Sequence, residues 1–207
     1  ERVLQHLPGR AALRLALDGV EPIEPFVVKR WLGGALAQLL NHSPRISNLC
    51  ESGGMLGDGN GWVHGAGGAK YWGLYGAAGL FLQAGGTVLM QHRAWWTAQG
   101  GTWGIPGGAR DSHETAAEAA IRETVEECGI DPALVEVRGE LLTTERDGWN
   151  YTTVLAHTSG GEQIPLEANE ESEELRWVPL DNLRELPLHP GFAASLDAVL
   201  RHTVTHD

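Results

Sequence analysis

The sequence predicts an α+β fold built around a mixed β-sheet. Three observations favour this class. Segments with a strand pattern outnumber those with a helical pattern, the helical patterns are few and scattered along the chain, and two pairs of turn residues, Gly85-Gly86 and Asp147-Gly148, separate neighbouring strands. This order is typical of a sheet covered by a few helices.

The expected elements follow one another after residue 60. Strands are predicted over residues 75–82, 87–93, 135–144, 151–157 and 175–178, and an extended segment ending in a glycine turn over 102–108. One helix is predicted over 112–128, with Ser112 as its N-cap and Gly129 as its end. A last helix, over 191–202, would bury one apolar face, formed by Phe192, Leu196, Val199 and Leu200.

Composition limits the classes of partner. The 207 residues carry a net charge of −12, which argues against a nucleic-acid polymer, because a phosphate backbone needs a basic footprint. Small anions remain open if a metal ion mediates their binding. Two cysteines, Cys50 and Cys128, cannot form a disulfide framework, so a reducing, cytoplasmic compartment is expected. No signal peptide is recognised, and no membrane span is expected, because the longest apolar stretch, residues 26–40, contains Lys29 and Arg30.

The first part of the chain differs from the rest. Residues 1–50 carry a net charge of +2, whereas the remainder carries −14. A stretch with five glycines, residues 51–61, follows and reads as a linker, so a domain boundary is predicted near residue 60. Within the N-terminal extension, residues 26–40 have helical spacing and would pack on the main domain or on a second copy. A membrane-surface helix and a poorly ordered extension remain alternatives.

Three carboxylates gather on the helix at 112–128. Glu123, Glu126 and Glu127 are neighbours at helical spacing, on an arc away from the apolar stripe, and Arg122 points to a different side. Two such charges about 5 Å apart repel by about 3 kcal/mol at an effective dielectric near 20. The group is either a solvated acidic face or a site for a hard divalent cation, which prefers oxygen ligands. The glycine turn before the helix favours the cation, since only glycine lets the backbone approach so closely.

The same residues resemble a known sequence signature. Gly108-Ala-Arg-Asp-Ser-His-Glu114, seven further residues, and Arg122-Glu-Thr-Val-Glu-Glu-Cys-Gly-Ile130 resemble the Nudix box. One position departs from the pattern, Thr124, where the family prefers an aliphatic residue. It lies on the predicted buried stripe, so it concerns packing rather than catalysis. The resemblance extends over about residues 72 to 202, and residues 1–60 lie outside it.

The resemblance implies an α/β/α sandwich that hydrolyses a nucleoside diphosphate linked to another group, with Mg²⁺, or Mn²⁺ in its place, as the cofactor. Glu123, Glu126 and Glu127 would bind the metal together with the Gly107 carbonyl. Arg122 would orient the glutamates, and Glu114 would pair with it. Each has a plainer alternative, an ordinary ion pair for Arg122 and a first-turn acid for Glu114.

Further site residues follow from the same resemblance. Arg93 and Gly108 would contact the substrate phosphates, with a surface strand end as the alternative for Arg93. Glu123 is favoured as general base. The weaker candidates for the base are Glu170, Glu171 and Glu174, in the acidic loop at 167–174. The alternative for this loop is a solvated surface segment.

Substrate preference rests on weaker signals. The marks of ADP-ribose and NADH pyrophosphatases are missing, so the chain resembles the MutT-like group, which cleaves nucleoside triphosphates, including 8-oxo-dGTP, to the monophosphate and pyrophosphate. The candidates to stack a purine are Trp95, Trp96, Trp149 and Tyr151, and His189 is a candidate to reach the site. Alternatives are a Nudix enzyme for ADP-ribose, a nucleotide sugar or a dinucleoside polyphosphate, and a non-catalytic sensor. A homodimer is a further possibility.

Overall fold

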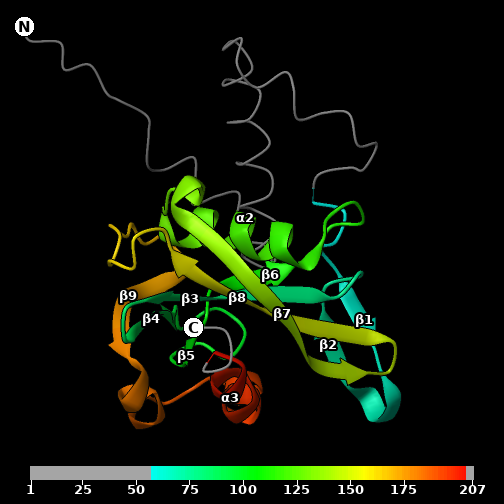
Figure 1. Ribbon diagram of the computed structural model, residues 1–207. Coiled ribbons are helices and arrows are strands. Elements are labelled where there is room, and N and C mark those ends of the chain that lie inside the picture. Colours follow the sequence, from blue (N-terminus) through cyan, green and yellow to red (C-terminus); the bar gives the residue numbers. More distant parts are fainter. Residues whose placement is uncertain (1–56, 204–207) are drawn as a thin grey trace, which may run out of the picture. The chain divides into compact units, whose positions relative to one another are not determined.

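The computed structural model describes residues 57–203 (Figure 1). The strands are β1 (Trp62–His64), β2 (Lys70–Trp72), β3 (Ala77–Ala84), β4 (Thr87–Arg93), β5 (Trp103–Gly104), β6 (Gly107–Ala109), β7 (Val135–Arg146), β8 (Trp149–Thr158) and β9 (Ser172–Pro179). The helices are α2 (Ala116–Cys128) and α3 (Pro190–Thr203), with short 3₁₀ turns η1 (Ala66–Gly68), η2 (Pro132–Leu134) and η3 (Leu180–Glu185). Cys50 and the predicted helix at 26–40 lie outside the described residues.

The central sheet is mixed, as predicted. Its strand order is β5-β4-β3-β8-β7, and β6 pairs with β3 while β9 pairs with β4. The pair β3–β8 is parallel, with Ala77 opposite Tyr151, and the other pairs are antiparallel. The α+β class with a mixed sheet is therefore confirmed.

Both predicted turns join strands. Gly85, at φ 56°, begins the turn between β3 and β4. Asp147 and Gly148, at φ 52° and 81°, connect β7 to β8, and two successive positive φ values suit the twist of an antiparallel hairpin. The strand predicted at 75–82 begins two residues later, at Ala77, because Gly76 adopts a φ of 92°.

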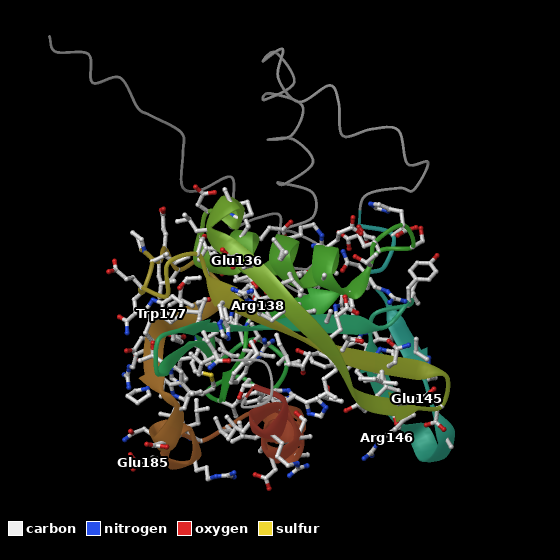
Figure 2. The ribbon with its side chains drawn as sticks, in the orientation of Figure 1. Glu136, Arg138, Glu145, Arg146, Trp177 and Glu185 are labelled. Atoms are coloured by element: carbon white, nitrogen blue, oxygen red, sulfur yellow. The ribbon has the colours of Figure 1, made fainter. Side chains whose placement is uncertain are left out.

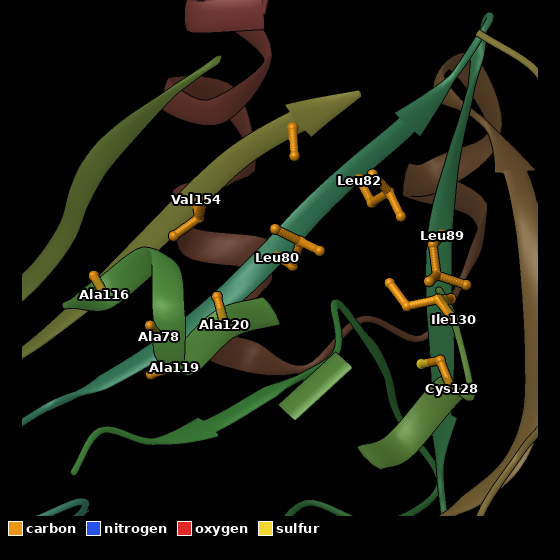
Figure 3. Packing of buried hydrophobic residues seen from close by; sticks show 11 residues of the cluster. Ala78, Leu80, Leu82, Leu89, Ala116, Ala119, Ala120, Cys128, Ile130 and Val154 are labelled. Atoms are coloured by element: carbon orange, nitrogen blue, oxygen red, sulfur yellow. The ribbon is translucent and has the colours of Figure 1, made fainter. Parts of the chain in front are cut away.

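The two helices cover opposite faces of the sheet. Successive strand residues point to opposite faces, so Leu80 packs under α2, whereas Phe81 packs under α3. On the α2 side, Ala116, Ala119 and Ala120 lie against β3 and β8, where their small side chains permit a close approach (Figure 3). On the other side, Phe192, Leu196 and Val199 of α3 are buried, as predicted, and Leu200 packs beside them. The result is an α/β/α sandwich.

Strand β7 is an edge strand with a charged outer surface. Glu136 and Arg138 lie next to each other on it, with 2.6 Å between Arg138 Nη2 and Glu136 Oε2, and Glu145 and Arg146 follow at its end (Figure 2). Charged side chains on an edge discourage pairing with another strand. Within the described part of the chain, neither helix is long and apolar enough to cross a membrane.

The N-terminal end of α2 differs from the prediction. Ser112 is not the cap: the helix starts at Ala116, and Thr115 caps it by accepting a hydrogen bond from Glu118 N. Glu118 in turn accepts from Thr115 N at 2.8 Å, which completes a capping box. The predicted C-terminal end is confirmed, with Gly129 at φ 64°.

Candidate active site

Arg122 contacts more residues of the candidate site than any other side chain that the structure describes, through hydrogen bonds and ion pairs. Its Nε donates to Glu114 Oε1 at 2.6 Å and its Nη2 to Glu114 Oε2 at 2.9 Å, a two-pronged pairing. Nη2 also donates to the Ala109 carbonyl oxygen at 3.0 Å, which connects the middle of the helix to β6. The pairing of Glu114 with Arg122 is therefore confirmed.

The expectation that Arg122 points away from the glutamates was wrong. Its Nη1 lies 2.9 Å from Glu123 Oε1 and 3.6 Å from Glu126 Oε1. A helical wheel places the Cα atom, but the long arginine side chain reaches back across the helix surface. The hydrogen bonds with Glu114 are the main reason that the pKa of Arg122 is raised. Burial alone would raise the pKa of Glu114, yet the hydrogen bonds from Arg122 and from the Asp111 amide, together with the charge of Arg122, outweigh it and lower that pKa.

Glu127 is buried, contrary to the expected acidic face. Only 4% of it is exposed, and its Oε2 accepts a hydrogen bond from Gly107 N at 3.0 Å. Burial, and then the charge of Glu123, raise the pKa of Glu127 to about 8. Burial raises the pKa of Glu123 to about 7, with Arg122 opposing the shift and Glu126 adding to it. Glu126, by contrast, has a side chain that is 58% exposed.

These carboxylates suit a hard divalent cation. They offer oxygen donors alone, from one end of one helix, and the shifted pKa values show that two of them lie where added positive charge would stabilise the ionised form. Arg122 supplies only one positive charge for the group. Glu123, Glu126 and Glu127, with the Gly107 carbonyl, stay the predicted ligands of the metal ion.

Glycine is required where β6 meets the helix. A Cβ atom on Gly108 would lie 2.5 Å from Glu123 Cδ, and one on Gly107 would lie 2.3 Å from the Ala78 carbonyl oxygen. Both distances are far inside van der Waals contact. These two residues belong to strand β6 and not to the predicted glycine turn, and their lack of side chains lets the Glu123 carboxylate lie directly over the backbone.

Gly108→Ala should therefore displace the Glu123 carboxylate and lower kcat by about tenfold or more, as expected when a metal ligand is moved. Gly139→Ala is the matched control, because a Cβ at Gly139 meets nothing within 4 Å. Steady-state kinetics of both variants make the comparison. Equal activity in the two would show that the Glu123 position does not matter for turnover.

Arg93 faces this group from the end of β4. Its charge lowers the pKa of Glu127 against the larger effect of burial, so the two are electrostatic neighbours. Its Nε donates to the Ala98 carbonyl oxygen at 3.1 Å, which holds the guanidinium against the 94–101 loop. The residue is thus placed at the site, and its contact with phosphate stays a prediction.

Tyr151 and His189 lie on the same side as Arg93. Burial raises the pKa of Tyr151, and Arg93, Glu127 and Glu123 all act on its hydroxyl. A Cβ on Gly79 would lie 2.1 Å from that oxygen, so the phenol occupies the space above β3. Burial, and then Arg93, lower the pKa of His189, whose Nδ1 accepts from Gly191 N at 3.1 Å. A neutral His189 ring therefore carries its proton on Nε2.

The structure separates the three candidates in the acidic loop. The charge of Glu171 adds to the raised pKa of both Glu123 and Glu127, so among the three it is the one that stays a predicted site residue. Glu174 instead pairs with Arg176 on β9, with 2.6 Å between Glu174 Oε1 and Arg176 Nη2. Glu170 is exposed, and the structure gives it no contact with the box.

The aromatic candidates for stacking on a purine differ in their position and exposure. Trp149 stacks on Tyr71 with ring centroids 5.0 Å apart and donates its Nε1–H to the Trp72 carbonyl oxygen, so it joins two hairpins. Trp95 is 79% exposed on the loop that follows Arg93. Trp96, on the same loop, is partly exposed. Trp95 and Tyr151 therefore remain the better placed residues for contact with a substrate.

A polar cavity of about 290 Å³ opens between the end of β7 and the start of α3. Its lining residues are Thr143, Thr144, Glu145, Arg146, Gly191, Ala194 and Ser195. It lies near His189 in sequence and on the Tyr151 face of the sheet. A larger hollow of about 430 Å³, beside Arg184 and Asp197, contains none of the site residues.

A second group of polar side chains fastens the segment before β1. Asp111, only 3% exposed, accepts hydrogen bonds from Gly57 N at 2.7 Å and Gly59 N at 2.8 Å. Asp58 accepts from Ser112 N at 2.9 Å. Among the residues that the structure describes, Asp58, Asp111 and His113 are the group with ligand atoms within 4.8 Å of one another. The backbone partners of Asp58 and Asp111 make these two residues a link between this turn and the box.

Removal of residues 1–60 should consequently lower thermal stability more than removal of residues 1–54. The longer deletion leaves the buried Asp111 carboxylate without its N–H donors, which costs about 1–3 kcal/mol. Thermal unfolding of both shortened chains makes the comparison. Both should keep kcat/KM within about tenfold of the full chain, a barrier change below ~1.4 kcal/mol. A folded chain that binds metal but turns over nothing would show that the first residues complete the site.

Residues 74–200 match the NUDIX domain family. The chain therefore belongs to the Nudix hydrolase family, as its box and its sandwich fold predict, and it is an enzyme of that family.

Particular relatives are similar over most of the described chain. A protein of Mycobacterium tuberculosis (strain ATCC 25618 / H37Rv), named "Putative 8-oxo-dGTP diphosphatase 3", is 54% identical over 149 residues, which cover 67% of this chain and 68% of the relative. A Bifidobacterium longum protein, named "Nucleoside triphosphate pyrophosphatase/Nudix hydrolase fusion protein", is 43% identical over 154 residues. The match covers 67% of this chain and 32% of that protein. The crystal structure of the M. smegmatis Nudix hydrolase RenU has a TM-score of 0.69 and 46% identity, covering 72% of this chain and 98% of that one.

Proposed function

We propose that the enzyme hydrolyses a nucleoside triphosphate, in particular an oxidised purine nucleotide such as 8-oxo-dGTP, to the nucleoside monophosphate and pyrophosphate, with Mg²⁺ as the cofactor. The main support is the carboxylate group around Arg122. In it the buried Glu127 and the partly buried Glu123 both have raised pKa values beside the Gly107-Gly108 backbone. The name of the M. tuberculosis relative supports the choice of nucleotide.

The proposed roles follow from position. Mn²⁺ or Mg²⁺, when bound, neutralises phosphate charge and lowers the pKa of a water molecule. Glu123, Glu126 and Glu127 bind the cation, and Arg122 keeps Glu123 and Glu126 in place through the contacts of its Nη1. Arg93 and the Gly108 backbone receive the phosphates. Glu123 or Glu171 accepts the proton of the attacking water, as the water oxygen bonds to phosphorus and the phosphoanhydride bond to the leaving phosphate oxygen breaks.

The nucleoside is proposed to occupy the face that carries Tyr151 and His189. The Nε2–H of a neutral His189 is a hydrogen-bond donor for a carbonyl oxygen, and the threonines of the neighbouring cavity add hydroxyl groups. Such polar groups discriminate strongly against a base that lacks the matching atoms.

Turnover of a substrate panel tests this assignment. The panel holds 8-oxo-dGTP, dGTP, ADP-ribose, a nucleotide sugar and diadenosine tetraphosphate, each with Mg²⁺ at constant ionic strength. The expected result is the highest kcat/KM for 8-oxo-dGTP. A preference for ADP-ribose or a dinucleoside polyphosphate would replace the substrate but keep the enzyme class, and binding without turnover would indicate a sensor.

We further propose a cytoplasmic location and no nucleic-acid polymer as partner, on the charge of −12 and the free, buried Cys128. Burial raises the pKa of that thiol, which keeps it protonated and unreactive. A homodimer through residues 1–60 stays a prediction, and sizing chromatography of the full chain tests it.

A further inference from the structure

The acidic loop at 167–172 caps the C-terminal end of α2. The last carbonyl groups of an α-helix lack partners within the helix. In α2 the carbonyl oxygens of Glu126, Glu127 and Cys128 all accept hydrogen bonds from this loop. The donors are Asn169 Nδ2 at 3.1 Å, Asn169 N at 3.2 Å and Glu167 N at 2.8 Å. The loop is therefore attached to the turn of the helix that carries two of the proposed metal ligands.

Asn169 makes most of these connections. Besides its two bonds to the helix, its Oδ1 accepts from Glu171 N at 2.8 Å, and its carbonyl oxygen accepts from Ser172 N at 3.2 Å. One side of the amide thus holds the helix and the other holds the backbone of Glu171. Both bonds need a side chain with a donor and an acceptor at the same length, which asparagine provides.

The segment held in this way contains Glu171, and its backbone contacts the residue that follows Arg93. Glu171 is the loop carboxylate that acts on Glu123 and Glu127. Its carbonyl oxygen accepts from Ala94 N at 2.8 Å, directly after Arg93. From the sheet side, the fully buried Gln91 donates through Nε2 to Ser172 Oγ at 2.9 Å. Asn169 therefore connects Glu171 to the helix, while the Ala94 amide and Gln91 connect the same segment to β4 and the residue after it.

We infer that Asn169 is a positioning residue, which holds Glu171 against the Glu123–Glu127 group by bridging the helix carbonyl of Glu126 and the amide of Glu171. The inference rests on the proposed function, in which Glu171 is one of the two candidates to accept the proton of the attacking water. Asn169 acts through Glu171, so its removal matters only while the Glu171 carboxylate is present.

A double-mutant cycle in the full chain with Mg²⁺ and 8-oxo-dGTP tests this dependence. Asn169→Ala should lower kcat by about tenfold or more, with a smaller change in KM, as is typical when a supporting hydrogen bond is lost. In a Glu171→Gln background the same change should lower kcat no further. Asn169→Ser should recover part of the rate, because a hydroxyl can accept from Glu171 N but is too short to reach the Glu126 carbonyl.

The matched control is Asn182→Ala. Asn182 is an exposed asparagine in η3 that donates to Glu185 Oε2 at 3.1 Å, away from the box. It should keep the kinetics of the unchanged chain. Multiplied losses in the double variant, or an Asn169→Ala variant with unchanged kcat, would overturn the inference. An unchanged kcat in Glu171→Gln would overturn both this inference and the proposed role of Glu171.

A readout without turnover separates this inference from the proposed function. The Ala94 amide is protected by the Glu171 carbonyl, so its hydrogen exchange reports where the loop lies. Asn169→Ala should speed exchange at Ala94 and Glu171. Asn169→Ser, which also serves if the alanine variant fails to fold, should speed it less, and Asn182→Ala should leave it unchanged. If exchange responds but the panel shows no hydrolysis, the proposed function fails and the positioning stands. If exchange does not respond, the positioning itself is wrong.

Discussion

Glu127→Gln should lower kcat by about 10²-fold or more and leave the folded structure intact. Glutamine keeps an oxygen to accept the Gly107 N–H but loses the charge that a divalent cation requires. Steady-state kinetics with Mg²⁺ measure the effect. Glu136→Gln, on the exposed outer face of β7, is the matched control and should be unchanged. Full activity in the Glu127 variant would show that its carboxylate has a structural role only.

The same substitution should change how stability depends on pH. In excess chelator, Glu127 has a pKa of about 8 in the folded chain, above its ordinary value of 4.5. The folded chain therefore binds the proton more tightly than the unfolded chain, and this contribution is complete below pH 4.5 and lost as the pH rises through 8. The unfolding free energy should fall by about 5 kcal/mol across that window. Glu127→Gln should flatten the decline, whereas an equally steep profile would contradict the burial of this group.

Arg122→Ala should reduce both stability and activity. Glu114, with a side chain 8% exposed, would lose its two-pronged partner, and Glu123 and Glu126 would lose their shared guanidinium. Removing one partner of a buried pair costs about 3–5 kcal/mol, and the 28% exposure of the Arg122 side chain reduces this to about 2–3 kcal/mol. Denaturant unfolding and kcat measure the two effects together.

Two further variants separate charge from geometry. Arg122→Lys keeps the charge but cannot donate to Glu114, Glu123 and the Ala109 carbonyl at once, so it should recover little activity. Arg138→Ala, which breaks the exposed pair with Glu136, should change stability by less than about 1 kcal/mol. If the lysine variant were fully active, the charge of Arg122 and not its hydrogen bonds would organise the glutamates.

The sequence predicted most elements and the centre of the site. Strand β4 and the turns at Gly85 and Asp147 matched, because local propensity and the packing of the sheet act in the same direction there. The box residues were identified, because their spacing is local. Local pattern also explains the wrong N-cap. Ser112 and Thr115 are both good caps, and only Thr115 has an acid three residues later, Glu118, to complete a capping box.

The remaining misses depend on contacts far apart in the sequence. Glu127 is buried because β6 approaches and Gly107 N donates to it, which a helical wheel does not contain. The hairpin β1–β2 lies in a glycine-rich stretch, and its strands are fixed by pairing Trp62 with Trp72 rather than by alternation. Asn169 stood among acids in an apparently solvated loop, with no local signal that it binds the end of α2.

Product analysis in ¹⁸O-labelled water tests the central claim, metal-dependent hydrolysis of a nucleoside triphosphate at the glutamate group, most directly. The full chain with Mg²⁺ should release pyrophosphate and nucleoside monophosphate in equal amounts, with one ¹⁸O atom per turnover in one of the two products. The same mixture in excess chelator, and the Glu127→Gln variant with Mg²⁺, should release almost none. Full turnover in chelator, or orthophosphate as the first product, would contradict the claim.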